Sequence, residues 1–453
     1  MTQKTSTDEQ VKTFRSAATK HILPHFANNA SLAREARIYT RGEGCYIYDI
    51  EGRRYLDTFA SLLTTICGHT HPEIVRAIEE QLHRLEFFPN YEDSFTLPQI
   101  QLAQKLAEIT PGDLAVTFFV NSGSEGNETA IKMARQYHRS CGQPQRYKVI
   151  ARKYSYHGTT LGCVSATGLS WFRHQFEPLL PGFLFAPAAR AHDRELASLN
   201  ALRELVEFEG PDSIAAIIMD PIPGSNTGFP LPPEGYLEGV RALCDEYGIL
   251  LIFDEVQTGF GKTGKWFACE HWGVTPDILV VGKGLAGGYV PVGAAITTPR
   301  IAGRFQKAPG DEFRSGSTFG GHTLGCAAAL KCIEIIESDN LLERASSLGK
   351  YLRKQLDELY EFPIVGDVRG IGLLWAIELM ADREQKTKFD PSLGLGKWIN
   401  AFCYDNGLIV RNAGEILVLA PALTITKEEI DSALETLGEA IAAATKHFEL
   451  TVQ

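Results

Sequence analysis

Apolar runs separated by amphipathic stretches characterise the middle of the chain. Residues 213–219, 249–253 and 278–281 are almost continuously apolar and have the length of strands buried on both faces. Residues 233–247, between the first two runs, fit a helix. A strand, a helix and a strand of these lengths predict a βαβ unit with a right-handed crossover, so we expect an α/β fold with parallel strands.

The pattern differs toward both ends of the chain. Residues 46–57 alternate around a Gly-containing turn, which predicts a hairpin. Residues 327–360 are mostly helical in pattern, and residues 368–377 predict further strands. Residues up to about Phe26 are polar and predict a partly ordered arm.

Two residues able to do chemistry follow the apolar runs. Asp254 comes directly after the run 249–253, and Lys283 comes two positions after the run 278–281. Because ligands in open α/β sheets bind at the carboxyl ends of strands, we expect both side chains to face one cleft. A desolvated lysine attacks aldehydes, and an aspartate can keep a pyridine nitrogen protonated. The pair fits pyridoxal 5′-phosphate (PLP), although an isolated aspartate and lysine are more often solvated charges.

The whole stretch 249–296 favours a PLP site over two solvated charges. It resembles, nearly residue for residue, the cofactor signature of the class III (ω-amino acid and amine:pyruvate) aminotransferases, which are fold-type I PLP enzymes. The resemblance implies that Lys283 is the catalytic residue, which forms a Schiff base with PLP and moves a proton between substrate and cofactor. It also implies that Asp254 pairs with the pyridine nitrogen, that Val256 packs on the ring and that Gln257 reaches its phenolic oxygen.

The resemblance covers about residues 30–445 and implies the fold. That fold is a large α/β domain with a mostly parallel seven-stranded sheet flanked by helices, plus a smaller α+β domain made from both chain ends. We therefore expect residues 1–70 to form an N-terminal arm and part of the small domain. Residues 71–330 would form the large PLP-binding domain, and residues 331–453 the C-terminal small domain.

A turn of small residues opens a predicted helix at Ser122. Ser122 and Glu125 have the spacing of a capping box, which by itself would only cap a helix. Free amides at a helix N-terminus also bind phosphate. The segment resembles the phosphate cup of the family, which implies that Ser122, Gly123 and Ser124 contact the phosphate of PLP.

Thr318 lies in a small-residue loop and would be unremarkable by itself. It matches the family threonine that binds the phosphate of the neighbouring subunit. The resemblance therefore implies a homodimer with shared active sites, or a tetramer.

Tyr156 and His157 follow the strand predicted at residues 147–151. An aromatic side chain at a sheet edge usually belongs to the core. In the family, the aromatic residue just before His-Gly stacks on the PLP ring, so Tyr156 is the predicted stacking residue and Val256 would pack on the opposite face. His157 is expected to act as a supporting hydrogen-bonding residue rather than as a base.

The substrate side is less well defined by the sequence. Arg411 matches the family arginine that binds the carboxylate of the keto acid, although a strand-end arginine also suits a surface salt bridge. Leu63 stands where several aryl-amine transaminases carry tryptophan, and Phe88 is a candidate wall residue that would equally suit an interface. Asp220 replaces the usual glutamate, which puts the contacts made there in doubt.

The predicted activity is PLP-dependent transfer of an amino group from an amine or ω-amino acid to a keto acid, with pyruvate as the expected acceptor, by a ping-pong mechanism. The identity of the donor stays open. The same fold and cofactor also serve decarboxylases, racemases and aminomutases, and a PLP-binding protein without catalysis is a further alternative. A nicotinamide enzyme is disfavoured because no GxGxxG follows an early strand.

Composition limits the partners and the compartment. The 453 residues are 44% hydrophobic and 22% charged, with a formal net charge of −11 and no basic run, so we expect a globular protein that does not bind nucleic acid. Nine dispersed cysteines without a CxxC pair predict free thiols in the cytoplasm. His69 and His71 lack further ligands nearby, so we expect no metal site. No stretch has the length of a membrane span, so we expect no membrane partner.

Overall fold

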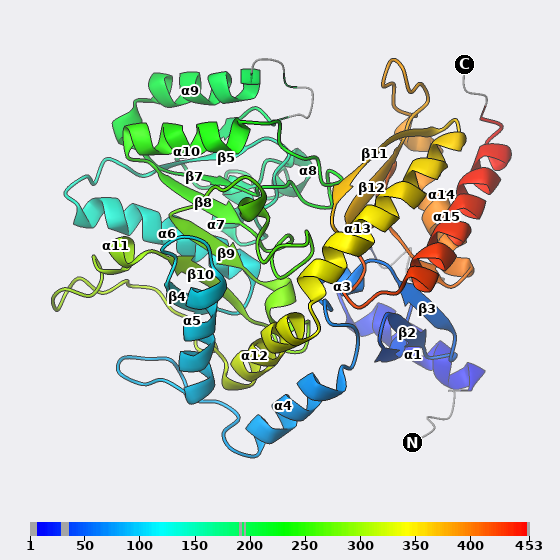
Figure 1. The fold of residues 1–453 in the computed structure, drawn as a ribbon, viewed down its shortest axis with the longest axis horizontal. Coiled ribbons are helices and arrows are strands. Elements are labelled where there is room, and N and C mark those ends of the chain that lie inside the picture. The colour runs from blue at the N-terminus through cyan, green and yellow to red at the C-terminus, as the bar shows by residue number, and fades with distance from the viewer. Residues whose placement is uncertain (1–6, 29–35, 190–192, 194–195, 451–453) are drawn as a thin grey trace.

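The computed structural model describes residues 7–28, 36–189, 193 and 196–450, and its largest sheet has seven strands (Figure 1). The order is β4-β10-β9-β8-β7-β5-β6. The pairs from β9 through β8, β7 and β5 to β6 are parallel, and β10 runs antiparallel to β4 and β9. The predicted mostly parallel seven-stranded sheet is confirmed. Its strands are β4 (Val116–Val120), β5 (Lys148–Arg152), β6 (Phe183–Ala186), β7 (Ile214–Met219), β8 (Leu250–Asp254), β9 (Ile278–Val281) and β10 (Gly293–Thr297).

The central strands of this sheet are buried along their whole length. Every residue of β7, β8 and β9 is buried, as their continuous apolar sequences predict. The predicted βαβ unit is β7, α10 and β8, with the two strands paired in parallel. The helices around the sheet are α5 (Leu97–Ile109), α6 (Gly123–Ser140), α7 (Leu161–Ala166), α8 (Ser170–Arg173), α9 (Ala197–Glu209), α10 (Tyr236–Tyr247) and α11 (Pro299–Ala302).

A smaller α+β part combines both ends of the chain, as the fold class predicts. One four-stranded sheet has the order β1-β2-β3-β13, and β13 pairs in parallel with β3 although about 350 residues separate them. The other has the order β11-β12-β15-β14. The strands are β1 (Tyr39–Glu43), β2 (Tyr46–Asp49), β3 (Arg54–Asp57), β11 (Val365–Ile371), β12 (Leu374–Leu379), β13 (Leu408–Ile409), β14 (Arg411–Ala413) and β15 (Ile416–Leu419).

Helices cover these sheets and connect the two parts. The helices are α4 (Pro72–Leu82), α12 (Thr323–Ser338), α13 (Leu341–Glu358), α14 (Leu395–Asp405) and α15 (Lys427–His447). Figure 1 places α15 on the same side of the molecule as β1, β2 and β3. The division of the chain at residues 70 and 330 stays a prediction. Among the described residues, no helix has the length and apolar character to cross a lipid bilayer.

The N-terminal segment is more regular than its composition predicts. The expected arm contains α1 (Asp8–His21), whose N-terminus is closed by a capping box between Thr7 and Gln10. Acidic residues in its first turn and basic residues in its last turn suit the helix dipole. Only Val11 of this helix is buried. Residues 1–6 of the expected arm lie outside the described residues.

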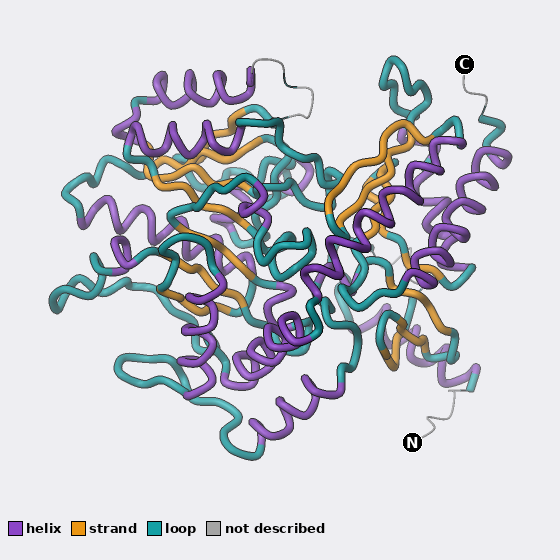
Figure 2. Tube along the Cα trace, in the orientation of Figure 1, coloured by secondary structure: helices purple, strands orange, loops and turns teal. Residues whose placement is uncertain are grey.

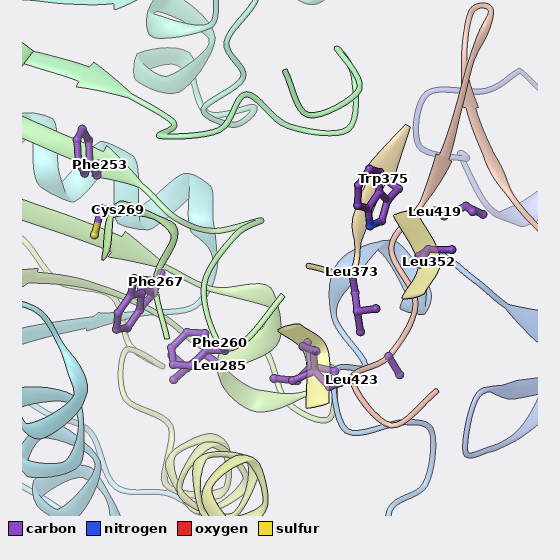
Figure 3. Close-up of a cluster of buried hydrophobic side chains, with 14 of the residues drawn as sticks. Phe253, Phe260, Phe267, Cys269, Leu285, Leu352, Leu373, Trp375, Leu419 and Leu423 are labelled. Carbon is purple, nitrogen blue, oxygen red and sulfur yellow. The ribbon is translucent and has the colours of Figure 1, made fainter. Parts of the chain in front are cut away.

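One buried core cluster joins the large sheet to the smaller part (Figure 3). Phe260 and Phe267 come from the segment after β8, and Leu373 and Leu423 come from the smaller part. In the same segment the Nζ of the buried Lys262 donates to two backbone oxygens of residues 420 and 421, at 2.9 and 2.5 Å. Figure 2 shows a band of loops between the large sheet and the smaller sheets. The segment after β8 therefore has contacts with both the large sheet and the smaller part. All nine cysteines are free thiols, as predicted.

Candidate active site

A cavity with about 580 Å³ of empty space lies at the carboxyl ends of β4, β7, β8 and β9. Nine of the candidate residues line it: Ser122, Gly123, Ser124, Tyr156, His157, Asp254, Val256, Gln257 and Lys283. Five further residues line it that were not predicted as contacts: Asn127, Gly158, Asp220, Ile222 and Gly224.

The carboxylate of Asp254 is fixed at the end of β8 by three donors. Asn127 Nδ2 donates to Oδ2 at 2.7 Å, and His157 Nδ1 lies 2.9 Å from the same oxygen. The Val256 amide donates to Oδ1 at 3.1 Å. A carboxylate held in this way can keep a heteroaromatic nitrogen protonated. The His157 ring therefore supports the Asp254 carboxylate.

Asn127 is the clearest site residue that sequence reasoning missed. It lies on α6, is almost fully buried, and its Nδ2 also donates to the His157 carbonyl at 2.8 Å. A signal was present, because Asn127 is four residues after Gly123 and a helix places such residues on one face. The partner Asp254 is 127 positions away, and no local pattern shows that contact.

The N-terminus of α6 provides the anion-binding end of the cavity. Ser122 Oγ accepts from the Glu125 amide at 3.2 Å, so half of the predicted capping box is present. The Glu125 carboxylate instead accepts from the Asn121 amide at 2.9 Å. The helix begins at Gly123, and within the described chain no partner accepts from the amides of Gly123 and Ser124. These amides and the helix dipole favour a phosphate.

Two glycines let the backbone lie close to this end of the cavity. A Cβ on Gly123 would lie 2.7 Å from Val256 Cγ1, and a Cβ on Gly158 would lie 2.3 Å from Ser124 Oγ. Neither position has room for a side chain. An anion cradle, a held carboxylate and a lysine in one cavity are the groups that PLP requires, so the residues present fit this cofactor.

Lys283 follows β9 by two residues and lines the cavity. Burial lowers the pKa of its amine to about 8, Asp254 opposes this shift, and Arg411 lowers the pKa further. Its amine is therefore uncharged far more often than that of an exposed lysine at neutral pH, which makes it a better nucleophile.

An aromatic side chain and an amide complete the walls of the cavity. The Tyr156 ring lies 5.1 Å from the Phe172 ring of α8, and burial raises the pKa of the Tyr156 hydroxyl. Gln257 Oε1 accepts from the Ser225 amide at 3.2 Å. The side chain of Gln257 therefore has one fixed partner beside the cavity.

Arg411 is the first residue of β14 and is partly buried beside the cavity. Its Nη2 donates to Asn226 Oδ1 at 2.6 Å, and its guanidinium carbon lies 5.3 Å from the centre of the Phe59 ring. Its buried Nε has no partner among the described residues, and none of their carboxylates pairs with it. Burial lowers the pKa of the guanidinium. The surface salt bridge considered from the sequence is therefore not formed with the described residues.

Besides Arg411, three candidate residues do not line this cavity. Leu63 is buried and packs in one cluster with Phe59 and with Ile222, which does line the cavity. Phe88 is about half exposed, and Thr318 is exposed in the loop before α12. The cavity of one chain is thus formed without these three side chains.

Asp220, the departure noted in the sequence, has a structural partner. Its Oδ1 accepts from the buried Arg152 Nη2 at 2.8 Å, whereas its Oδ2 has no partner among the described residues. Asp220 thus lines the cavity as half of an ion pair. The sequence does not reveal this pair, because Arg152 ends a different strand.

Comparison with known proteins identifies the family. The model of the family "Aminotransferase class-III" matches residues 28–441. An aminotransferase of Bacillus subtilis is 40% identical over 89% of this chain and 92% of its own length. A gamma aminobutyrate transaminase of Solanum lycopersicum is 34% identical over 93% of this chain and 83% of its own. An adenosylmethionine-8-amino-7-oxononanoate aminotransferase of Nitratidesulfovibrio vulgaris is 36% identical over 96% and 82%.

Solved structures agree with this assignment. An (S)-enantioselective ω-transaminase from Thermomicrobium roseum superposes with a TM-score of 0.93 at 38% identity, covering 98% of this chain and 100% of that one. An ω-transaminase from Pseudomonas jessenii in complex with PMP, the amine form of PLP, superposes with a TM-score of 0.91 at 32% identity, covering 96% and 98%. With a PLP-compatible cavity and a family match over most of its length, the chain belongs to the class III aminotransferases, which use PLP.

Proposed function

We propose that this enzyme transfers an amino group from an amine or ω-amino acid donor to a keto acid acceptor, with pyruvate as the acceptor, in a ping-pong cycle. The observation that carries the acceptor class is Arg411. A partly buried guanidinium without a counter-anion among the described residues is costly, and a carboxylate group of the substrate would compensate its charge. The charge of Arg411 also lowers the pKa of Lys283, which supports a position of Arg411 near the reacting amine.

The candidate residues divide into cofactor holders and a reacting group. Ser122, Gly123 and Ser124 would hold the phosphate at the N-terminus of α6, and Asp254, held by Asn127 and His157, would keep the pyridine nitrogen protonated. Tyr156 and Val256 would pack on the ring faces, and Gln257 would contact the phenolic oxygen. When bound, PLP supplies an electron sink for a carbanion.

Lys283 would have two tasks. Its amine would first bind the cofactor covalently, which the lowered pKa favours because the uncharged amine is the nucleophile. Once displaced by the substrate amine, the same amine would take the proton from the substrate carbon and return it at the cofactor carbon. Asp254 opposes the lowering of this pKa and so keeps the amine basic enough for the second task.

The donor is proposed from the relatives. The names of the relatives include a gamma aminobutyrate transaminase, and those of the solved structures include ω-transaminases. Both groups of names support donors whose amine is not beside a carboxylate. Such a donor and a keto acid would share one site because Arg411 can bind the acceptor carboxylate and remain with Asn226 when the donor lacks one.

We also propose a cytoplasmic homodimer whose sites are shared, with a tetramer as a larger form. Thr318 is exposed and lies outside the cavity of its own chain, so it is available to a second copy. Large exposed apolar side chains accompany Phe88 in the same region of the sequence: Leu82, Leu85, Tyr91, Phe95, Leu97 and Ile100. Exposed apolar side chains of this kind support an interface.

The test begins with absorbance spectra of the PLP-loaded protein as single amino donors are added without a keto acid. Conversion of the aldehyde form to the amine form of the cofactor would support the proposal and identify the donor class. Failure of every amine and ω-amino acid to convert it would contradict the proposal and favour a decarboxylase or racemase. Lys283→Ala should abolish both the yellow colour and turnover. Arg411→Ala should raise KM for pyruvate, and an unchanged KM would remove the proposed role of this arginine.

A further inference from the structure

A turn of left-handed backbone follows β3. The φ angles of Ala60, Ser61, Leu62 and Leu63 are 45°, 46°, 69° and 64°. Residues other than glycine rarely adopt this conformation singly, and four in succession are strained. The turn is closed by the Leu63 amide, which donates to the Phe59 carbonyl at 2.9 Å. Some group outside the turn must stabilise it.

The buried carboxylate of Asp57 provides this stabilisation. Its Oδ1 accepts from the Phe59 amide at 3.1 Å, and its Oδ2 accepts from the amide and hydroxyl of Ser61 at 2.7 and 3.2 Å. His69 Nε2 lies 3.1 Å from the same Oδ2 and also holds the carboxylate. The hydrogen bonds therefore define both the start and the direction of the turn.

The turn positions an aromatic ring against the substrate arginine. Phe59 is the residue just before the turn, and its ring lies 5.3 Å from the guanidinium carbon of Arg411. Thr58 ties the same backbone to the strand before Arg411, because its hydroxyl donates to the Ile409 carbonyl at 2.6 Å. Leu63, at the other end of the turn, packs in one cluster with Ile222 of the cavity wall.

We propose that Asp57 is a positioning residue for the substrate side of the active site. Its carboxylate holds the turn Ala60–Leu63, the turn places Phe59 against Arg411, and the placed guanidinium binds the carboxylate group of the substrate. This inference rests on the proposed function of Arg411. It gives Asp57 a role in the affinity of the enzyme for carboxylate-bearing substrates and no role in cofactor binding.

The test is Asp57→Asn in the full-length, PLP-loaded enzyme. The amide keeps the size of the side chain but replaces one acceptor oxygen with a donor, so an amide of the turn loses its partner. We expect KM for a keto acid to rise about tenfold, while kcat, the PLP absorbance and KM for an amine without a carboxylate change less than about twofold. Equal changes in both KM values, or none, would overturn the proposal.

Asp49→Asn is the matched control. The carboxylate of Asp49 is similarly buried in the same sheet and accepts from the amides of Glu51 and Arg53 at 3.0 and 2.9 Å. None of its hydrogen bonds among the described residues reaches the turn or Arg411. We expect it to leave both KM values unchanged, and a keto acid effect equal to that of Asp57→Asn would contradict the proposal.

Two further variants keep the test decisive if Asp57→Asn fails to fold and separate this inference from the proposed function of Arg411. Phe59→Leu keeps the Asp57 carboxylate and its backbone partners but removes the ring, and it should also raise KM for the keto acid selectively. An unchanged KM would overturn the proposal even if Asp57→Asn failed to fold. If Arg411→Ala leaves KM for the keto acid unchanged, the proposed function of Arg411 fails. If Arg411→Ala raises it and Asp57→Asn does not, only this inference fails.

Discussion

Replacing the neutral partner of Arg411 with a charged one is the sharpest test of the acceptor site. Asn226 Oδ1 accepts from Arg411 Nη2 at 2.6 Å, so the arginine is oriented by an amide dipole and keeps its full charge for a ligand. Asn226→Asp preserves the size and the acceptor oxygen but adds a negative charge at the same place. The substrate carboxylate would then compete with a carboxylate already in contact.

The size of the effect follows from Coulomb's law. With charge centres about 4 Å apart and an effective dielectric constant of about 20, the new pair gains about 4 kcal/mol. The desolvation of the added carboxylate offsets part of this gain. If one third to two thirds remains, substrate binding weakens by about 1.4 to 2.8 kcal/mol, which is about 10- to 100-fold in KM for the keto acid.

Steady-state kinetics with one fixed amine donor and a varied keto acid measure this change. KM for a donor that has no carboxylate should change little, because that donor does not need the guanidinium. Asn412→Asp is the matched control, since it adds the same charge on the next residue of β14, whose side chain points to the opposite face. Equal KM values for the keto acid in wild type and Asn226→Asp would refute the argument that Arg411 binds it.

Three further predictions concern cofactor binding and stability. Burial lowers the pKa of Lys262 to about 7 from 10.5. Between these two pH values the unfolded chain binds one proton more than the folded chain. The free energy of unfolding therefore rises with pH by up to about 1.4 kcal/mol per pH unit. Lys262→Met should remove this rise in urea unfolding between about pH 7 and 9, and an unchanged pH slope would contradict the shift. Gly158→Ala should weaken PLP binding about tenfold in a titration of the apoprotein, because its Cβ would lie 2.3 Å from Ser124 Oγ, whereas Gly142→Ala has open space and should not. Because the uncharged Lys283 amine reacts, the rate of covalent PLP capture by the apoprotein should rise with pH and level off above about 8, and a flat profile would contradict its pKa.

The sequence predicts the large sheet well because its physical signals are local. Continuous apolar runs specify strands buried on both faces, as in β7, β8 and β9. Asp254 and Lys283 were placed correctly at one cleft because parallel strands bring their carboxyl ends to one edge of the sheet. The geometry of the cavity thus follows from strand order more than from any single residue.

The supporting contacts could not be predicted because they join distant segments. Asn127 of α6 pairs with Asp254, and Asp220 pairs with Arg152, between elements whose relative placement no local pattern encodes. Leu63, which stands where several aryl-amine transaminases carry tryptophan, ends a left-handed turn. The apolar sequence of this turn does not favour the conformation, and the contacts of Asp57 explain it.

The charges around the cavity couple substrate binding to the basicity of Lys283. Arg411 contributes to the lowered pKa of this lysine because two cations repel each other. A substrate carboxylate bound to Arg411 cancels that repulsion, so we expect the pKa of the free Lys283 amine to rise when the carboxylate is in place. The coupling is reciprocal, since protonated Lys283 then also favours the bound anion. The lysine would thus be the stronger base when a carboxylate-bearing substrate is bound than when the site holds a simple amine, and Arg411→Ala should abolish the difference between their pH–rate profiles.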